Sequence, residues 1–135
     1  MLSTSEIEDK AMPLYTAISE EGVIPSETKR KIAEEITRIH CSIMNVPKDF
    51  VRVVFVSYPP GSGFTGGVEA PTTALTGVLR SGHTAEEKKE LLTLLWRAFQ
   101  ELTGIQTDQL ALSLQEIPSS NAMEMGRIMQ AVGRE

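Results

Sequence analysis

The chain has a single cysteine, Cys41, and therefore cannot close a disulfide within itself. It has only two histidines, His40 and His83, and no second thiol. A structural zinc site needs several cysteines and histidines at close spacing, so we expect no metal site. A chain that uses so little cysteine fits a reducing compartment, and this favours the cytoplasm.

Positive charge and long apolar runs are also scarce. Lysine and arginine number 13 against 18 acidic residues, and basic residues gather only in the short run 29–31. The sequence therefore lacks the clustered basic residues that a nucleic-acid-binding surface needs. No apolar run approaches the roughly 20 residues that span a membrane, and the first residues, "MLSTSEIEDKA", lack the apolar region of a signal peptide. We expect neither nucleic acid nor a membrane as a partner.

What the sequence does contain is an order of strand, helix and strand. Residues 13–19 and 51–58 have the β-branched and apolar composition of strands, and the second run is continuous enough to predict a strand covered on both sides. Residues 27–44 between them predict a helix, with Ser26 as its N-cap. The helix has one apolar stripe at a spacing of three to four residues, made by Ile32, Ile36, Ile39 and Ile43.

The same order recurs in the second half of the chain. Residues 73–79 and 109–117 predict strands, and residues 84–102 between them predict a helix. Thr84 and Glu87 have the spacing of a capping box at its start. The two halves also align at single positions: Val46 with Ile105, Asp49 with Asp108, and Pro59 with Pro118. This is an internal repeat of two βαβ units.

The repeat predicts an α+β (α/β) fold in one domain. We expect residues 1–12 to be an N-terminal extension and residues 13–135 to form the domain, with its two βαβ units at about 13–58 and 73–117. Two such units pair into one four-stranded sheet with both helices on one face. The other face of the sheet is then apolar, and in a chain this short we expect another subunit to cover it.

Few single residues suggest chemistry from the sequence alone. Three glycines, at 61, 63 and 66, match the GxGxxG pattern, but they lead into a strand and not into a helix N-terminus, so we expect no dinucleotide and no other cofactor. His40 lies about 80° from Ile32 around its helix, at the edge of the buried stripe. There it either points into a pocket or hydrogen-bonds to backbone.

Two charged residues, Arg80 and Glu124, have structural interpretations. Arg80 ends a predicted strand, where it either binds a carboxylate bidentately or makes a surface salt bridge. A helical interpretation of residues 118–129 places Glu124 near Arg127 at a spacing of three, as a solvated pair.

Several motifs together resemble the tautomerase superfamily, and within it the cis-3-chloroacrylic acid dehalogenase group. They are Met12-Pro13 followed by "LYTAIS", His40, "GGV" from Gly66, "LRSGHTAEEK" from Leu79 and "EIPSSNAMEMGR" from Glu116. The resemblance covers residues 13–134, and the last motif is the most specific. It implies tandem βαβ units, a homotrimer, and an amino-terminal proline that serves as catalytic base or acid once the initiator methionine is removed.

The resemblance also implies roles for single residues. Pro13 takes the role of the proline, His40 assists substrate binding, and Glu124 activates water. Arg80 binds the carboxylate of a small substrate. Two positions depart from the family pattern, because its second carboxylate-binding arginine falls on His83 and its water-orienting tyrosine falls on Ser113.

The greatest departure concerns Pro13 itself, which follows Met12 instead of beginning the chain. The nitrogen of an internal proline is an amide with neither a proton to exchange nor a basic lone pair. The sequence thus predicts a protein of this type whose proline-dependent activity is impaired or absent at full length. Two alternatives stay open. One is an active tautomerase or hydratase on small unsaturated or enol carboxylates once Pro13 is N-terminal, and the other is a non-catalytic trimer that binds a small carboxylate through Arg80 and His83.

Overall fold

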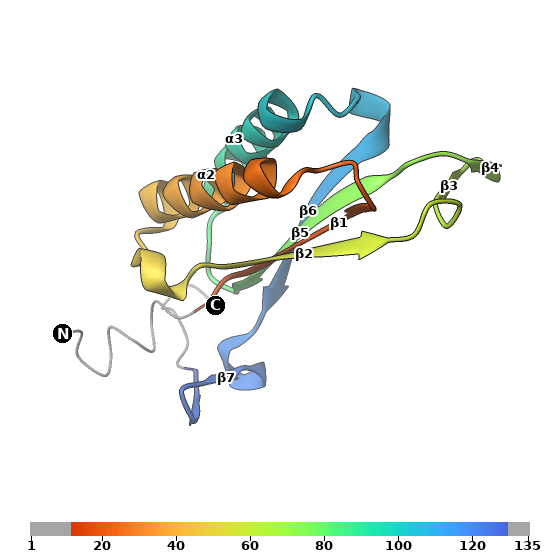
Figure 1. Ribbon diagram of the computed structural model, residues 1–135. Helices are drawn as coiled ribbons and strands as arrows, with labels where there is room; N and C mark the ends of the chain where they lie inside the picture. The colour runs from red at the N-terminus through yellow and green to blue at the C-terminus, as the bar shows by residue number, and fades with distance from the viewer. Residues whose placement is uncertain (1–11, 130–135) are drawn as a thin grey trace.

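The fold is built from one mixed sheet and two helices, seen in a computed structural model that describes residues 12–129 (Figure 1). The main strands and helices, in chain order, are β1 (Leu14–Glu20), α2 (Ser26–Met44), β2 (Arg52–Tyr58), β5 (Thr73–Arg80), α3 (Ala85–Thr103) and β6 (Leu110–Ile117). Short pieces connect them: η1 (Lys48–Phe50), β3 (Phe64–Thr65), β4 (Val68–Glu69), η2 (Thr107–Gln109), η3 (Ser119–Asn121), β7 (Met123–Glu124) and β8 (Arg127–Ile128).

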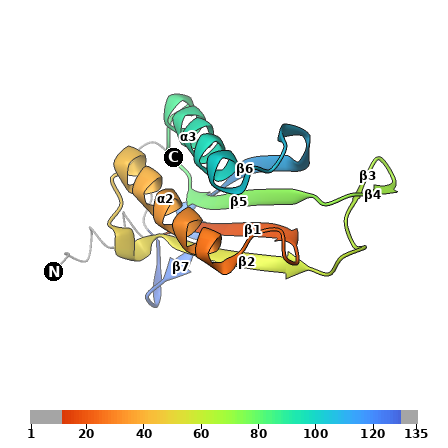
Figure 2. The ribbon, with the colours of Figure 1, turned by 45° about the horizontal axis from the view of Figure 1, so that its top comes forward.

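The sheet confirms the predicted repeat. Its strand order is β2-β1-β5-β6, in which β1 and β2 are parallel, β5 and β6 are parallel, and the two pairs meet antiparallel at β1 and β5. Each helix therefore connects two parallel strands, and both helices lie on the same face of the sheet (Figure 2). The expected fold class, two βαβ units in one four-stranded sheet, is correct.

The helix ends differ from the sequence prediction in one respect. Thr84 and Glu87 form the expected capping box before α3, with each side chain bonded to the other's backbone N–H. Ser26, however, is not an N-cap: it is the first helical residue of α2, and the extended residue before it is Pro25, which has no side-chain acceptor. Proline fits that position because its fixed φ suits extended backbone.

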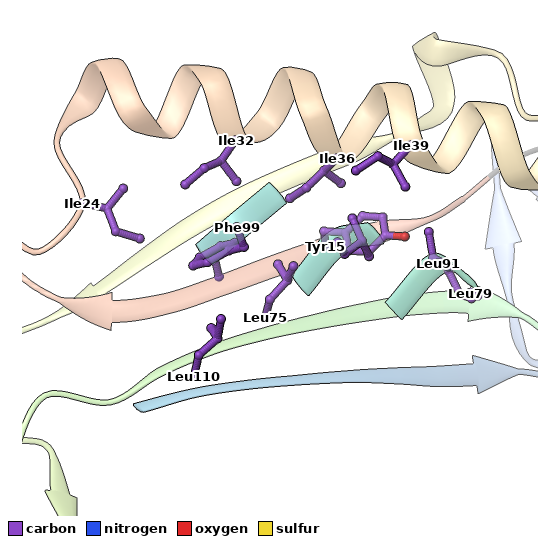
Figure 3. Close-up of a cluster of buried hydrophobic side chains, with 12 residues drawn as sticks. Tyr15, Ile24, Ile32, Ile36, Ile39, Leu75, Leu79, Leu91, Phe99 and Leu110 are labelled. Atoms are coloured by element: carbon purple, nitrogen blue, oxygen red, sulfur yellow. The ribbon is translucent and has the colours of Figure 1, made fainter. Parts of the chain in front are cut away.

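The core lies between the helices and the sheet (Figure 3). Alternate residues of β1 and β5 point toward the helices and are buried, among them Tyr15, Ala17, Leu75 and Leu79. The apolar stripe of α2 meets them as predicted, with its first three isoleucines buried and the fourth packed at the margin. Each aliphatic side chain buried in this way contributes roughly 1.5–3 kcal/mol.

The opposite face of the sheet is apolar and open. Leu14, Ile18, Val54 and Val56 expose 37%, 44%, 47% and 44% of their surfaces. The prediction that β2 is covered on both sides is therefore wrong within one chain: β2 is an edge strand whose residues alternate between the helical side and this open face.

The C-terminal segment forms a hairpin where the sequence suggested a helix. β7 and β8 pair antiparallel, and Glu124 lies directly opposite Arg127. The helical interpretation of this segment is wrong, because a spacing of three also fits the two residues that flank a two-residue turn, here Met125 and Gly126, both at positive φ. The GxGxxG run, residues 61–66, includes β3 of a second short hairpin, β3 with β4, where the sequence predicted only a loop.

Within residues 12–129 no helix has both the length and the apolar content needed to cross a membrane. The same part of the chain has no group of three or more potential metal ligands placed to hold an ion.

Candidate active site

Pro13 lies at the start of β1 with its side chain fully buried. Its nitrogen is joined to Met12, and its carbonyl accepts a hydrogen bond of 3.1 Å from the backbone N–H of Arg52. In the pairing of β1 with β5, Leu14 is opposite Val78. Val78 is two residues before the end of β5, so Pro13, which precedes Leu14, lies near that end.

Arg80 ends β5 at this point and is only 4% exposed. Its Nε and Nη2 atoms donate to the hydroxyl of Ser119, at 3.3 and 2.8 Å. Ser119 is itself 1% exposed. The surface position considered for Arg80 is therefore wrong, since the guanidinium is buried. Apart from its place in the "EIPSSN" motif, no pattern in the sequence pointed to Ser119.

Glu124 approaches Pro13 from the C-terminal hairpin. Its Oε2 atom accepts a hydrogen bond of 3.2 Å from the backbone N–H of Met12 and lies 3.5 Å from Nη1 of Arg52. The Glu124 side chain is 12% exposed, whereas that of Arg52 is 56% exposed. Sequence reasoning missed Arg52, although the parallel pairing of β1 with β2 places it beside Leu14.

His40 lies near the C-terminal end of α2, four residues before its last residue, Met44, and is 2% exposed. Its Nδ1 atom is 2.7 Å from the hydroxyl of Tyr15, and the two rings meet edge to face at 79°. The alternative of a histidine bonded to backbone is thus wrong, because its partner is a side chain on β1. Burial, and to a lesser degree the charge of nearby His83, lowers the pKa of His40 to about 4, so His40 is neutral at pH 7.

Ser113 lies apart from these residues. It sits in the middle of β6, is exposed, and pairs with Thr76, which has its side chain on the open face of the sheet. His40 and Tyr15 are on the helical face, so a single chain does not bring Ser113 to Pro13. The structure thus gathers Pro13, His40, Arg80, His83 and Glu124 around one end of the sheet and leaves Ser113 on its other side.

A known family matches most of the chain. Residues 12–123 match a family described as "Putative oxalocrotonate tautomerase enzyme". The chain belongs to this tautomerase family.

Solved structures extend the likeness. N1, a member of the cis-3-chloroacrylic acid dehalogenase family, is 28% identical with a TM-score of 0.81, over 89% of this chain and 85% of that one. Native Ps01740 is 29% identical with a TM-score of 0.81, over 82% of this chain and 99% of that one. Pt0534 inactivated by 2-oxo-3-pentynoate shares the fold at 24% identity and a TM-score of 0.78. No match was found among curated proteins.

The residues gathered around Pro13 differ in what they can do in acid-base chemistry. The nitrogen of Pro13 is an amide and cannot exchange a proton. His40 is neutral and can offer one N–H or one lone pair at a time. The carboxylate of Glu124 is an acceptor, and in this chain it is already bonded to the backbone that leads into Pro13.

Proposed function

We propose that this chain is a tautomerase of the cis-3-chloroacrylic acid dehalogenase type whose proline-dependent activity is impaired or absent while residues 1–12 precede Pro13. The observation that carries the proposal is the contact of 3.2 Å between the Met12 N–H and Glu124. A free amino-terminal proline would have a basic nitrogen at this place, and the chain puts a peptide bond there instead.

Each gathered residue has a role in the proposal. Arg80 binds the carboxylate of a small enol or unsaturated acid, since a buried guanidinium recognises a carboxylate well. His40 assists from the helical side, and Glu124 activates water or moves a proton once it no longer holds Met12. His83 stands where the family has a second arginine, so we expect weaker carboxylate binding than in relatives with both arginines.

The proposal includes assembly as a homotrimer in the cytoplasm. The open apolar face of the sheet, with Leu14, Ile18, Val54 and Val56, supports a subunit interface. Solved structures of fused 4-OT with the same fold, 18–19% identical, are described as trimers. In such an assembly Ser113 would face a neighbouring subunit instead of its own Pro13.

Two versions of the protein test the function. One is the full chain, with intact mass confirming a start at Met1, and the other begins at Met12, so that methionine removal leaves Pro13 N-terminal. Ketonisation of phenylenolpyruvate should be no faster with the full chain than with its Pro13→Ala variant, and at least a hundredfold faster with the shorter protein. Rapid turnover by the full chain that survives Pro13→Ala would falsify the proposal.

The second candidate function is non-catalytic binding of a small carboxylate, favoured by the burial of Arg80. It predicts that a small dicarboxylate such as maleate raises the melting temperature of the full chain, that Arg80→Ala abolishes the shift, and that neither version turns over enols. Turnover by the protein that begins at Pro13 would exclude this candidate.

A further inference from the structure

Tyr15 is a buried residue beside the site, and it has no role in the proposal so far. It is fully buried on β1, under α2 and among aliphatic side chains (Figure 3). Its hydroxyl lies 2.7 Å from Nδ1 of His40. Two residues that are 25 positions apart in sequence are thus joined by a buried side-chain hydrogen bond next to Pro13.

The direction of this hydrogen bond follows from the surroundings of the hydroxyl. Within residues 12–129, Nδ1 of His40 is the only partner that the Tyr15 hydroxyl has. If the hydroxyl accepted from an Nδ1–H, its own hydrogen would be buried with no acceptor in that part of the chain, which is unfavourable. Burial also raises the pKa of Tyr15, so the phenol keeps its proton and remains a donor.

The ring of Tyr15 occupies space that its neighbour on β5 leaves open. Gly77 is the residue paired with Tyr15, and a Cβ atom at position 77 would lie 2.5 Å from Cε1 of the tyrosine ring. Glycine leaves the room that the ring occupies. Since β1, β5 and α2 all limit its movement, the hydroxyl is presented to Nδ1 in one fixed direction.

We propose that Tyr15 is a positioning residue that holds neutral His40 as the imidazole tautomer with hydrogen on Nε2. Because the Tyr15 hydroxyl donates to Nδ1, that nitrogen must carry a lone pair, and the ring proton must be on Nε2. His40 then meets an anionic oxygen of the substrate as an N–H donor and does not serve as a base. This role in substrate binding rests on the proposed function, whereas the tautomer itself does not.

Nitrogen NMR of the full chain tests the assignment. In uniformly ¹⁵N-labelled protein at pH 7, long-range proton–nitrogen correlations should show Nε2 of His40 protonated and Nδ1 as a hydrogen-bonded acceptor. Tyr15→Phe keeps the ring and removes the donor, and it should yield a mixture of both imidazole tautomers. Tyr58→Phe is the matched control, because the Tyr58 hydroxyl bonds to the backbone of Thr72, and this change should leave the His40 signals as they are.

Two results would overturn the inference: a proton on Nδ1 in the unaltered protein, or an unchanged tautomer in a folded Tyr15→Phe variant. The spectrum of the unaltered protein decides even if the variant fails to fold. In the protein that begins at Pro13, we expect Tyr15→Phe to lower kcat/KM about tenfold. Absence of all turnover there would contradict the proposed function, while the NMR result would still decide the tautomer.

Discussion

The backbone N–H of Met12 donates a hydrogen bond of 3.2 Å to the carboxylate of Glu124, 112 positions along the chain. Met12 has a φ of 69°, in the left-handed region that non-glycine residues rarely adopt. The same carboxylate is 3.5 Å from Arg52. The hydrogen bond offsets the strain at Met12 and holds the peptide group before Pro13 at the end of the sheet.

Removing this acceptor should expose the Met12 amide to solvent more often. In Glu124→Ala, we expect the Met12 amide to exchange with solvent about tenfold faster, because a hydrogen bond to a charged acceptor is worth about 1.5 kcal/mol. Hydrogen exchange followed by NMR measures this. Glu116→Ala is the control, since it breaks the ion pair of 2.6 Å with Lys88 and leaves Met12 untouched. Equal exchange rates for Met12 in the unaltered protein and Glu124→Ala would contradict the prediction.

The open sheet face gives a second prediction. Val54 on β2 is 47% exposed on the apolar face, so Val54→Glu would place a charge in any interface formed there. Sedimentation velocity should show trimers for the unaltered chain and mainly monomers for Val54→Glu. Thr93→Glu, on the exposed side of α3, should remain trimeric. If Val54→Glu remained trimeric as well, the subunits would have to meet through another surface.

Local patterns in the sequence were enough to predict the sheet and the helices. The period of Ile32, Ile36 and Ile39 identifies the buried side of α2, and the Thr84 and Glu87 pair identifies the start of α3. These features depend on neighbours a few residues apart, which a single sequence displays directly. The repeat then limits how two βαβ units can pair.

The partners of the site residues could not be predicted in this way. Three contacts of the site join distant segments, and no local period in the sequence indicates them. They are Tyr15 with His40, Arg80 with Ser119, and Met12 with Glu124. The C-terminal hairpin was missed because three-residue spacing fits both a helix and a tight hairpin. The residues alone left His40 and Glu124 without a chemical role, and only the resemblance to tautomerases assigned them one.

The two helix starts allow a paired test of capping. Thr84 accepts from the N–H of Glu87 at 3.1 Å, so Thr84→Ala should lower the free energy of unfolding by about 1 kcal/mol. Ser26 makes no such bond, and Ser26→Ala should change stability by less than about 0.5 kcal/mol. Urea unfolding at one protein concentration compares them. A larger loss for Ser26→Ala than for Thr84→Ala would contradict the N-terminal boundary of α2.

Acid should destabilise the fold through His40. Its pKa is lowered to about 4 in the folded chain from an ordinary 6.5, by burial and by His83, while its hydrogen-bond partner Tyr15 stays neutral. Between these values the unfolded state binds more protons, so stability is fully present above pH 6.5 and is lost as pH falls toward 4. The loss is on the order of 3 kcal/mol. Denaturation at pH 7.5 and 4.5 should show a smaller loss for His40→Gln, and equal losses would refute this assignment.

Gly77 should be intolerant of any side chain because of the ring beside it. A Cβ at this position would lie 2.5 Å from Cε1 of Tyr15 and 3.0 Å from Cδ2 of Leu114, and both partners are packed against the helices. We expect Gly77→Ala to lower the free energy of unfolding by about 1–3 kcal/mol, the usual result of overpacking a core. Gly77→Ala should also be coupled to Tyr15→Leu. In the Tyr15→Leu background the ring is gone, and Gly77→Ala should lower the free energy of unfolding by less than it does in the unaltered chain. A double-mutant cycle by urea unfolding measures this coupling. Additive effects would show that the ring of Tyr15 is not the reason why position 77 is intolerant of a side chain.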